Sequence, residues 1–120
     1  MDFELFNTYS NKTELFIPLD DNDIRIYACG PTVYDYIHVG NARPLIIFDV
    51  LVRFLKLIYP KVTYVRNITD VDDKIIVQAN QNKESINNLT ERTIKAFSDD
   101  ADALFVEKPD FEPRATEHIQ

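Results

Sequence analysis

The order of apolar and polar runs along the chain predicts a strand, a helix and a second strand. A short run of β-forming residues, 24–29, precedes a long and mostly apolar segment, residues 41–59. Pro60 ends that segment, and residues 62–67 form a second β-like run. Two strands joined by one helix form a βαβ unit, which implies parallel strands and a right-handed crossover. The pattern therefore predicts an α/β fold.

The predicted helix 41–59 is apolar over nearly all of its surface. Its polar residues Asp49, Arg53 and Lys56 are spaced four and three apart and form one narrow stripe. A helix of this kind is expected to be covered on most sides. Pro44 is tolerable only within its first turn.

The flanking segments predict a hairpin and further helices. Residues 3–6 and 14–17 read as an N-terminal β-hairpin. Thr69 or Asp70 can cap a helix at residues 71–80, and apolar residues at helical spacing predict another helix over residues 86–104. A last helix is expected from Pro113 through Gln120, where the sequence stops inside the element.

Composition narrows the class of protein. With 120 residues, the chain can form one small domain, and its net charge of −7 argues against a dominant electrostatic surface for nucleic acid. A single cysteine excludes an intrachain disulfide framework and suits a reducing compartment. No signal peptide is visible, and charged residues interrupt the apolar run 45–58, so we expect a cytoplasmic location and no membrane span.

Residues 29–43 carry the candidate chemistry, with the sequence Cys-Gly-Pro-Thr-Val-Tyr-Asp-Tyr-Ile-His-Val-Gly-Asn-Ala-Arg. A thiol stands at the end of the first strand, and His-x-Gly-Asn stands at the start of the helix. Free backbone N–H groups and the helix dipole favour negative charge there. Taken alone, the His-x-Gly-Asn also suits a helix-capping turn with a surface histidine, and a lone cysteine is usually a small buried hydrophobe.

The combination of motifs closely resembles that of cysteinyl-tRNA synthetases. Residues 64–75, Tyr-Val-Arg-Asn-Ile-Thr-Asp-Val-Asp-Asp-Lys-Ile, resemble the next block of that family, and residues 5–8 and 111–116 also match. The resemblance covers nearly the whole chain. It implies a Rossmann-type (HUP-like) parallel sheet with flanking helices, incomplete here, in which residues 1–120 are the N-terminal portion of a class I catalytic domain. It also implies ATP-dependent activation of cysteine and its transfer to the 3′ end of tRNA(Cys).

The resemblance assigns roles to three residues of the His-x-Gly-Asn motif. His38 and Asn41 would be the catalytic residues, which stabilise the triphosphate during in-line attack on the α-phosphorus. Gly40 would let the adenosine of ATP approach the backbone. Asn41 stands where the general class I pattern has histidine, and an amide donates a hydrogen bond without carrying charge. The ATP would bind with Mg²⁺.

The resemblance also assigns the amino-acid pocket. Cys29 would be a zinc ligand, and zinc would select a thiol substrate because it prefers sulfur to a hydroxyl. Gly30, Thr32 and Thr69 would bind the substrate cysteine. The other zinc ligands are expected in absent sequence, because the chain has no second cysteine, His38 is assigned to ATP and His118 reads as a surface residue. The family's lysine-bearing loop is expected there too, because no Lys-Met-Ser-Lys-Ser-like segment occurs in this sequence. The fragment alone is expected to be nearly inactive, and the whole enzyme is expected to be a monomer.

Several residues keep simpler interpretations. Thr69 can be a helix cap, and the acidic cluster of Asp70, Asp72 and Asp73 is expected to be helix-start carboxylates in solvent. For Arg43, Arg53 and Arg66 we expect surface and ion-pair roles rather than RNA contacts.

Three rival functions stay open. The first is an ATP-dependent ligase that joins cysteine to an aminosugar, and the second is a binding module for ATP or zinc without chemistry. The third, a hydrolase with a Cys29–His38 pair, lacks an orienting third group.

Overall fold

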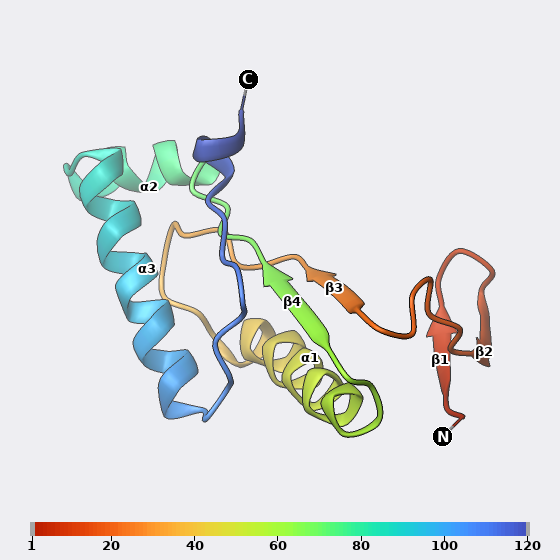
Figure 1. The fold of residues 1–120 in the computed structure, drawn as a ribbon. Helices are drawn as coiled ribbons and strands as arrows, with labels where there is room; N and C mark the ends of the chain where they lie inside the picture. Colours follow the sequence, from red (N-terminus) through yellow and green to blue (C-terminus); the bar gives the residue numbers. More distant parts are fainter. Residues whose placement is uncertain (1, 120) are drawn as a thin grey trace.

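Two parallel strands and the helix that connects them form the centre of the structure, a computed structural model that describes residues 2–119 (Figure 1). Strand β3 (Ile24–Ala28) pairs with β4 (Val62–Arg66), with Ile24 opposite Val62 and Ala28 opposite Arg66. Helix α1 (Val39–Ile58) makes the crossover between them. The predicted βαβ unit and the α/β class are confirmed. Of the Rossmann-type sheet, the described residues contain this one parallel pair.

Helix α1 begins at Val39, two residues before the predicted start. His38 is its N-cap, and the His38 Nδ1 atom accepts a hydrogen bond from the Gly40 N–H at 3.0 Å. In return, the Asn41 side-chain oxygen accepts from the His38 N–H at 3.2 Å. These reciprocal bonds satisfy two backbone donors at the start of α1, so the helix begins earlier in the sequence than predicted. Pro44 therefore lies inside the helix, and the expectation that it falls in the first turn is wrong.

The main core lies between α1 and the two strands. It contains Ile24, Ala28, Val52, Leu55, Val62 and Tyr64, all nearly inaccessible to water. Burial of each large apolar side chain contributes roughly 1.5–3 kcal/mol, so this contact accounts for the position of α1 on the sheet.

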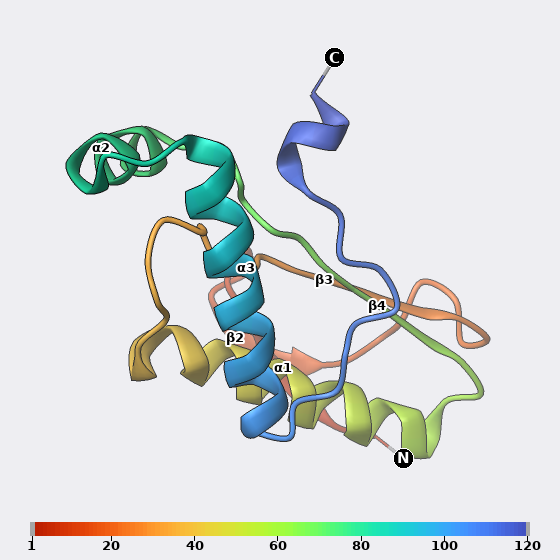
Figure 2. The same ribbon diagram turned by 90° about the vertical axis from the view of Figure 1, so that its left-hand side faces the viewer.

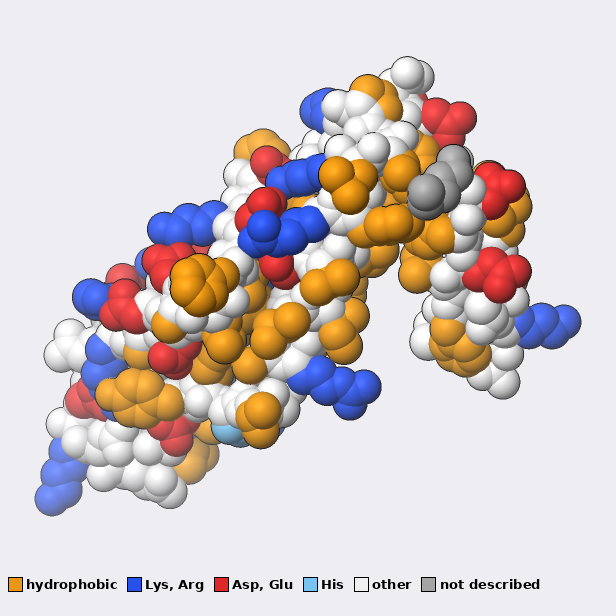
Figure 3. Space-filling view, turned by 90° about the horizontal axis from the view of Figure 1, so that it is seen from below, with side chains coloured by type: hydrophobic (Ala, Val, Ile, Leu, Met, Phe, Trp, Pro, Cys, Tyr) orange, Lys and Arg blue, Asp and Glu red, His pale blue; other side chains and the backbone are white. Residues whose placement is uncertain are grey.

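The expectation that α1 is covered on most sides is wrong. Ile47, Val50 and Leu57 are 52%, 60% and 83% exposed. A two-stranded sheet is too narrow to cover more than one face of a helix. Figure 3 shows hydrophobic side chains gathered over this underside of the molecule.

The polar stripe of α1 does not face solvent throughout, because Asp49 is buried. Its carboxylate accepts from Arg53 Nε at 2.8 Å and from the Glu107 backbone N–H at 2.8 Å. The predicted ion-pair role of Arg53 is confirmed, and that arginine also donates to the Phe105 carbonyl. The stripe therefore fastens α1 to the chain that follows the last long helix.

Helices α2 (Asp73–Asn82) and α3 (Ile86–Ala103) confirm the two predicted helices. Asp72 caps α2 by accepting from the Lys74 N–H at 2.8 Å. The expected cap at Thr69 or Asp70 is therefore wrong, and α2 begins two residues late. None of the helices within residues 2–119 is long and apolar enough to cross a membrane.

The chain after α3 runs back beside β4 (Figures 1 and 2). Arg66 N donates to the Phe111 carbonyl at 3.1 Å, and Ile68 N donates to the Pro113 carbonyl at 2.9 Å. Both contacts are parallel bridges, so this segment continues the sheet on the far side of β4.

The predicted terminal helix from Pro113 is wrong, and only a short 3-10 helix, η1 (Ala115–His118), forms. The reason is that Pro113 and Ala115 are bonded through their backbones to Ile68, which keeps the chain extended. Gln120 lies outside the described residues.

Asp70 is buried against η1, so its predicted place in solvent is wrong. Its carboxylate accepts from the Thr116 backbone N–H at 2.9 Å and from Thr116 Oγ1 at 2.6 Å. Burial by itself would raise the pKa of Asp70, but these hydrogen bonds outweigh it and hold the pKa below its ordinary value. Asp72 and Asp73 stand at the start of α2, as expected.

The N-terminal hairpin is confirmed, and it is set off from the body (Figures 1 and 3). Strands β1 (Glu4–Asn7) and β2 (Lys12–Leu15) pair antiparallel, with Glu4 opposite Leu15. Phe3 stacks on Phe16 with ring centroids 5.0 Å apart and meets Phe54 of α1 edge-on at 5.1 Å. Aromatic contacts therefore join the hairpin to the body.

Gly30 lets the turn after β3 lie directly against the end of β4. Its N–H donates to the Asn67 side-chain oxygen at 2.7 Å. A Cβ built on Gly30 would stand 1.6 Å from the Asn67 backbone oxygen, so only glycine permits this approach.

Replacing Gly30 with alanine should therefore destabilise the fold. We expect Gly30→Ala to lower the free energy of unfolding by about 1–3 kcal/mol or more, because the new methyl group meets backbone that cannot move aside. Urea denaturation followed by circular dichroism measures the change. Gly40→Ala is the comparison variant and should lose less, since its Cβ would meet a side chain, the exposed His38 ring, at 2.8 Å and no backbone atom. An equal loss in both variants would contradict the explanation.

Candidate functional site

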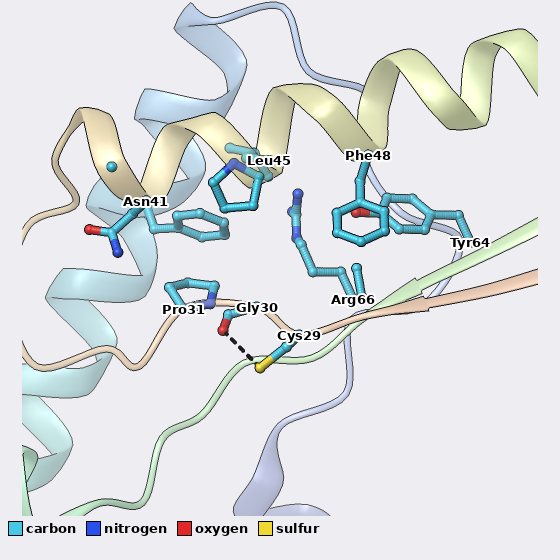
Figure 4. A pocket seen from close by; sticks show the side chains of 12 residues that line it. Cys29, Gly30, Pro31, Asn41, Leu45, Phe48, Tyr64 and Arg66 are labelled. Atoms are coloured by element: carbon cyan, nitrogen blue, oxygen red, sulfur yellow. Dashed lines mark hydrogen bonds between the residues drawn. The ribbon is translucent and has the colours of Figure 1, made fainter. Parts of the chain in front are cut away.

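The candidate motifs meet at the carboxyl end of β3, around one cavity of about 110 Å³ (Figure 4). The turn after β3, the first turns of α1, the end of β4 and one residue of α3 all contribute to its wall. The lining residues are Ala28, Cys29, Gly30, Pro31, Gly40, Asn41, Pro44, Leu45, Phe48, Tyr64, Arg66 and Phe97. Segments far apart in sequence thus form a single small site at the place where parallel sheets bind ligands.

Cys29 is the first residue after β3, and its thiol is free and exposed. The Cys29 Sγ lies 3.6 Å from the Gly30 carbonyl oxygen. The simpler interpretation of Cys29 as a small buried hydrophobic residue is therefore wrong. An exposed thiol beside a cavity is open to a ligand or a metal.

The tautomer of His38 follows from its role as a cap. Because Nδ1 accepts a hydrogen bond from the Gly40 N–H, the proton of the neutral ring is on Nε2. The ring is exposed, so this Nε2–H can donate to a ligand in front of α1. Gly40 and Asn41 line the cavity, while His38 is not among the lining residues.

A hydrogen bond of the cap also fixes the orientation of the Asn41 side chain. Its side-chain oxygen is occupied by the His38 N–H, which leaves the amide NH₂ as a free pair of donors. The start of α1 therefore presents an imidazole N–H, an amide NH₂ and the positive end of a helix dipole. That set of donors suits an anion.

The structure brings Thr32 and Thr69 together through their backbones. The two residues form a parallel bridge, in which Val33 N donates to the Thr69 carbonyl at 3.1 Å and Thr69 N donates to the Pro31 carbonyl at 3.0 Å. Neither threonine lines the cavity beside Cys29, although Gly30 does. Because Asp72 caps α2, the alternative role of Thr69 as a cap is removed.

Arg66 is buried, so its predicted place on the surface is wrong, whereas its predicted ion-pair role is confirmed by its contact with Glu112. It is only 5% exposed, and its Nε and Nη2 atoms donate to the Glu112 carboxylate. Its guanidinium also lies over the Phe97 ring, 5.0 Å from the centroid. The available signal was the period of two along β4, which puts Arg66 on the same buried face as Val62 and Tyr64.

Tyr64 stands beside this guanidinium. Burial raises the pKa of its hydroxyl, and the positive charge of Arg66 partly opposes that rise. Tyr64 is therefore a neutral hydrogen-bonding group at neutral pH.

The described residues do not form a complete metal centre. Within residues 2–119 there is no group of three or more histidine, cysteine or carboxylate side chains close enough to hold an ion. Cys29 can supply one ligand. His118, an exposed residue as expected, lies on η1, where its Nδ1 is 3.0 Å from the Arg114 carbonyl. Arg43 is exposed on α1.

The comparisons with known proteins agree with the motifs. Residues 15–120 match the family model described as "tRNA synthetases class I (C) catalytic domain". A Cysteine--tRNA ligase from Ehrlichia ruminantium (strain Gardel) is 55% identical over 115 residues, which is 96% of this chain and 25% of that relative. Proteins of the same name from Rhodospirillum centenum and Paraburkholderia xenovorans are 55% and 53% identical, over 99% and 96% of this chain. The chain spans 26% and 25% of those relatives.

The family match covers far more than half of the chain, and Cys29, Gly40 and Asn41 of the first motif line one cavity. The chain therefore belongs to the family of class I (C) tRNA synthetase catalytic domains.

Proposed function

We propose that this chain forms the N-terminal part of the catalytic domain of a cysteine–tRNA ligase. The enzyme activates L-cysteine with ATP and Mg²⁺ to give cysteinyl-adenylate and pyrophosphate, and then transfers cysteine to tRNA(Cys). The observation that carries this proposal is the shared cavity, where an exposed thiol and the donor-rich start of α1 meet. The names of the relatives support the same function.

The start of α1 supplies the phosphate-binding chemistry of this proposal. The His38 Nε2–H and the Asn41 amide donate to triphosphate oxygens, and their charge stabilisation grows as the α-phosphorus is attacked. Both side chains are held by their reciprocal cap bonds, so they need little reorganisation. Gly40 leaves room for the His38 ring in the structure, and we propose that it also lets the nucleotide approach the backbone.

The turn after β3 supplies the amino-acid pocket. Cys29 provides one thiolate to a zinc ion, and the remaining ligands come from parts of the protein outside this sequence. Zinc, when bound, selects a sulfur ligand over a hydroxyl. Gly30 contacts the substrate through its backbone, while Thr32 and Thr69 lie just beyond on the paired continuation of the two strands. We further propose that the enzyme is a cytoplasmic monomer.

The function is tested by the full-length protein that contains this sequence. We expect it to charge tRNA(Cys) with radiolabelled cysteine when ATP and Mg²⁺ are present. The matched assay offers an aminosugar acceptor in place of tRNA. If cysteine is transferred to the aminosugar but not to tRNA, the proposed function is replaced by that of the related ligase. If pyrophosphate exchange does not depend on cysteine, the protein is only a binding module.

The role of His38 is tested by two substitutions that separate catalysis from capping. Asparagine is a good N-cap, so His38→Asn keeps the helix start but removes the Nε2 donor. We expect cysteine-dependent pyrophosphate exchange to fall roughly 10²–10³-fold in both His38→Asn and His38→Ala. Only His38→Ala should also lose stability, by about 0.5–2 kcal/mol. Normal exchange by His38→Asn would limit this residue to a structural role.

The role of Cys29 is tested by the metal content of the full-length protein. Cys29→Ser should lose zinc, measured by mass spectrometry of metals after dialysis, because a hydroxyl is a poor zinc ligand. Stability without metal should change by less than about 0.5 kcal/mol, since the exposed thiol makes no core contact. Full zinc retention by Cys29→Ser would remove this residue from the metal site.

A further inference from the structure

The position of the Cys29 thiol is set by the backbone around it. The thiol is exposed, and its sulfur lies 3.6 Å from the carbonyl oxygen of Gly30, the next residue of the same turn. Side chains alternate along β3, so Cys29 follows Arg25 and Tyr27 on the face turned away from α1, and Figure 4 shows its sulfur on that side. An exposed side chain gains little restraint from packing. The peptide units before and after Cys29 therefore decide where the sulfur lies.

One residue at the end of the neighbouring strand, Asn67, bonds to the chain on both sides of Cys29. The Asn67 backbone N–H donates to the Ala28 carbonyl at 3.4 Å. The Asn67 side-chain Oδ1 accepts from the Gly30 N–H at 2.7 Å. Because Ala28 and Gly30 immediately precede and follow Cys29, a single distant residue restrains both flanking peptide units. The first bond needs only a backbone N–H, which every residue except proline has, whereas the second needs this side chain.

The side-chain bond matters because residue 30 is a glycine. Glycine is required where the turn lies against the Asn67 backbone, but it also has the widest choice of backbone angles. The Asn67 backbone blocks movement of Gly30 in one direction only. A hydrogen bond is selective in both distance and angle, so the Oδ1 bond restrains the turn in the other directions.

We propose that Asn67 is a positioning residue of the amino-acid pocket, an inference that rests on the proposed function. Asn67 acts through Cys29 and Gly30 and does not itself bind the substrate or the metal. Its side chain fixes the turn after β3, so that the thiolate and the Gly30 backbone keep one arrangement. Sites of this kind need their groups held within about 0.5 Å of the productive geometry. A turn that depended on glycine alone would not give that precision.

The zinc affinity of the full-length protein tests this role, measured by competition with a coloured chelator. Asn67→Leu has nearly the shape of asparagine but lacks the acceptor. We expect its zinc dissociation constant to rise about tenfold or more, as is usual when a residue that orients a metal ligand is replaced. Asn67→Asp keeps an oxygen at the same reach and should bind zinc at least as tightly as wild type. Asn67→Ser, whose hydroxyl is too short to reach Gly30, should behave like Asn67→Leu and replaces it if the leucine variant does not fold.

Pyrophosphate exchange in excess zinc gives a second readout that a general loss of stability would not produce. In Asn67→Leu the KM for cysteine should rise about tenfold, while the KM for ATP should change less than about twofold, because uniform binding is lost for one substrate only. The start of α1 is held by its own capping bonds, independently of Asn67. An equal rise in both KM values would overturn the inference.

The matched control is Thr63→Val, which removes a side-chain hydrogen bond at the other end of the same strand pair. Thr63 shares a face of β4 with Asn67, and its Oγ1 donates to Asp23 Oδ1 at 3.0 Å, just before β3. This variant should lose stability but keep the zinc affinity of wild type. An equal loss of zinc affinity in Thr63→Val and Asn67→Leu would limit Asn67 to a structural role. Unchanged zinc affinity in Asn67→Leu would also overturn the inference.

Charging of tRNA(Cys) by the wild-type protein, measured in parallel, separates the two proposals. Normal charging with a zinc affinity that does not depend on Asn67 overturns the positioning role alone. A zinc affinity that depends on Asn67 without any charging supports the positioning role and overturns the proposed function.

Discussion

The close pairing of β3 with β4 is the constraint on which the site depends. The pairing does not stop at Ala28 and Arg66, because the Gly30–Asn67 bond and the Thr32–Thr69 bridge extend it past both strand ends. Each of these contacts joins the first motif block to the second. If Gly30 carried a side chain, the two blocks could not come this close. The cavity is therefore a product of backbone pairing, and the side chains of α1 complete it.

The start of α1 shows how one set of atoms can serve folding and ligand binding. The capping bonds use the His38 Nδ1 and the Asn41 oxygen, both acceptors, and leave the donors of the same side chains facing outward. A helix cap consumes acceptors, whereas an anion needs donors. The two demands thus fall on opposite ends of each side chain and do not compete.

Much of the fold could be predicted from the sequence, because short-range patterns of apolar and polar residues indicate the βαβ order, the hairpin and two later helices. What failed depends on contacts between distant residues. Asp70 looked like a solvent-facing carboxylate because its partner Thr116 is 46 residues away. Arg66 looked like a surface residue because a charged side chain is usually exposed. Glu112 and Phe97, which are distant in sequence, form the buried environment that accommodates its charge. In the site, the motif predicted that Cys29, Gly30 and Asn41 lie together around one cavity. The shape of that cavity, and the positions of Thr32 and Thr69 outside its lining, follow only from packing.

The Arg66–Glu112 pair also has a consequence for the order of events during synthesis. Its two members are separated by 46 residues, and the strand-like segment that carries Glu112 joins the sheet last in chain order. On a ribosome, β3, α1 and β4 emerge while the guanidinium still has no carboxylate, so a nascent chain must keep that charge hydrated and the inner face of β4 partly open. This part of the core therefore closes only after residues 107–116 have left the exit tunnel. These residues complete, as the last step, a unit whose local elements form early.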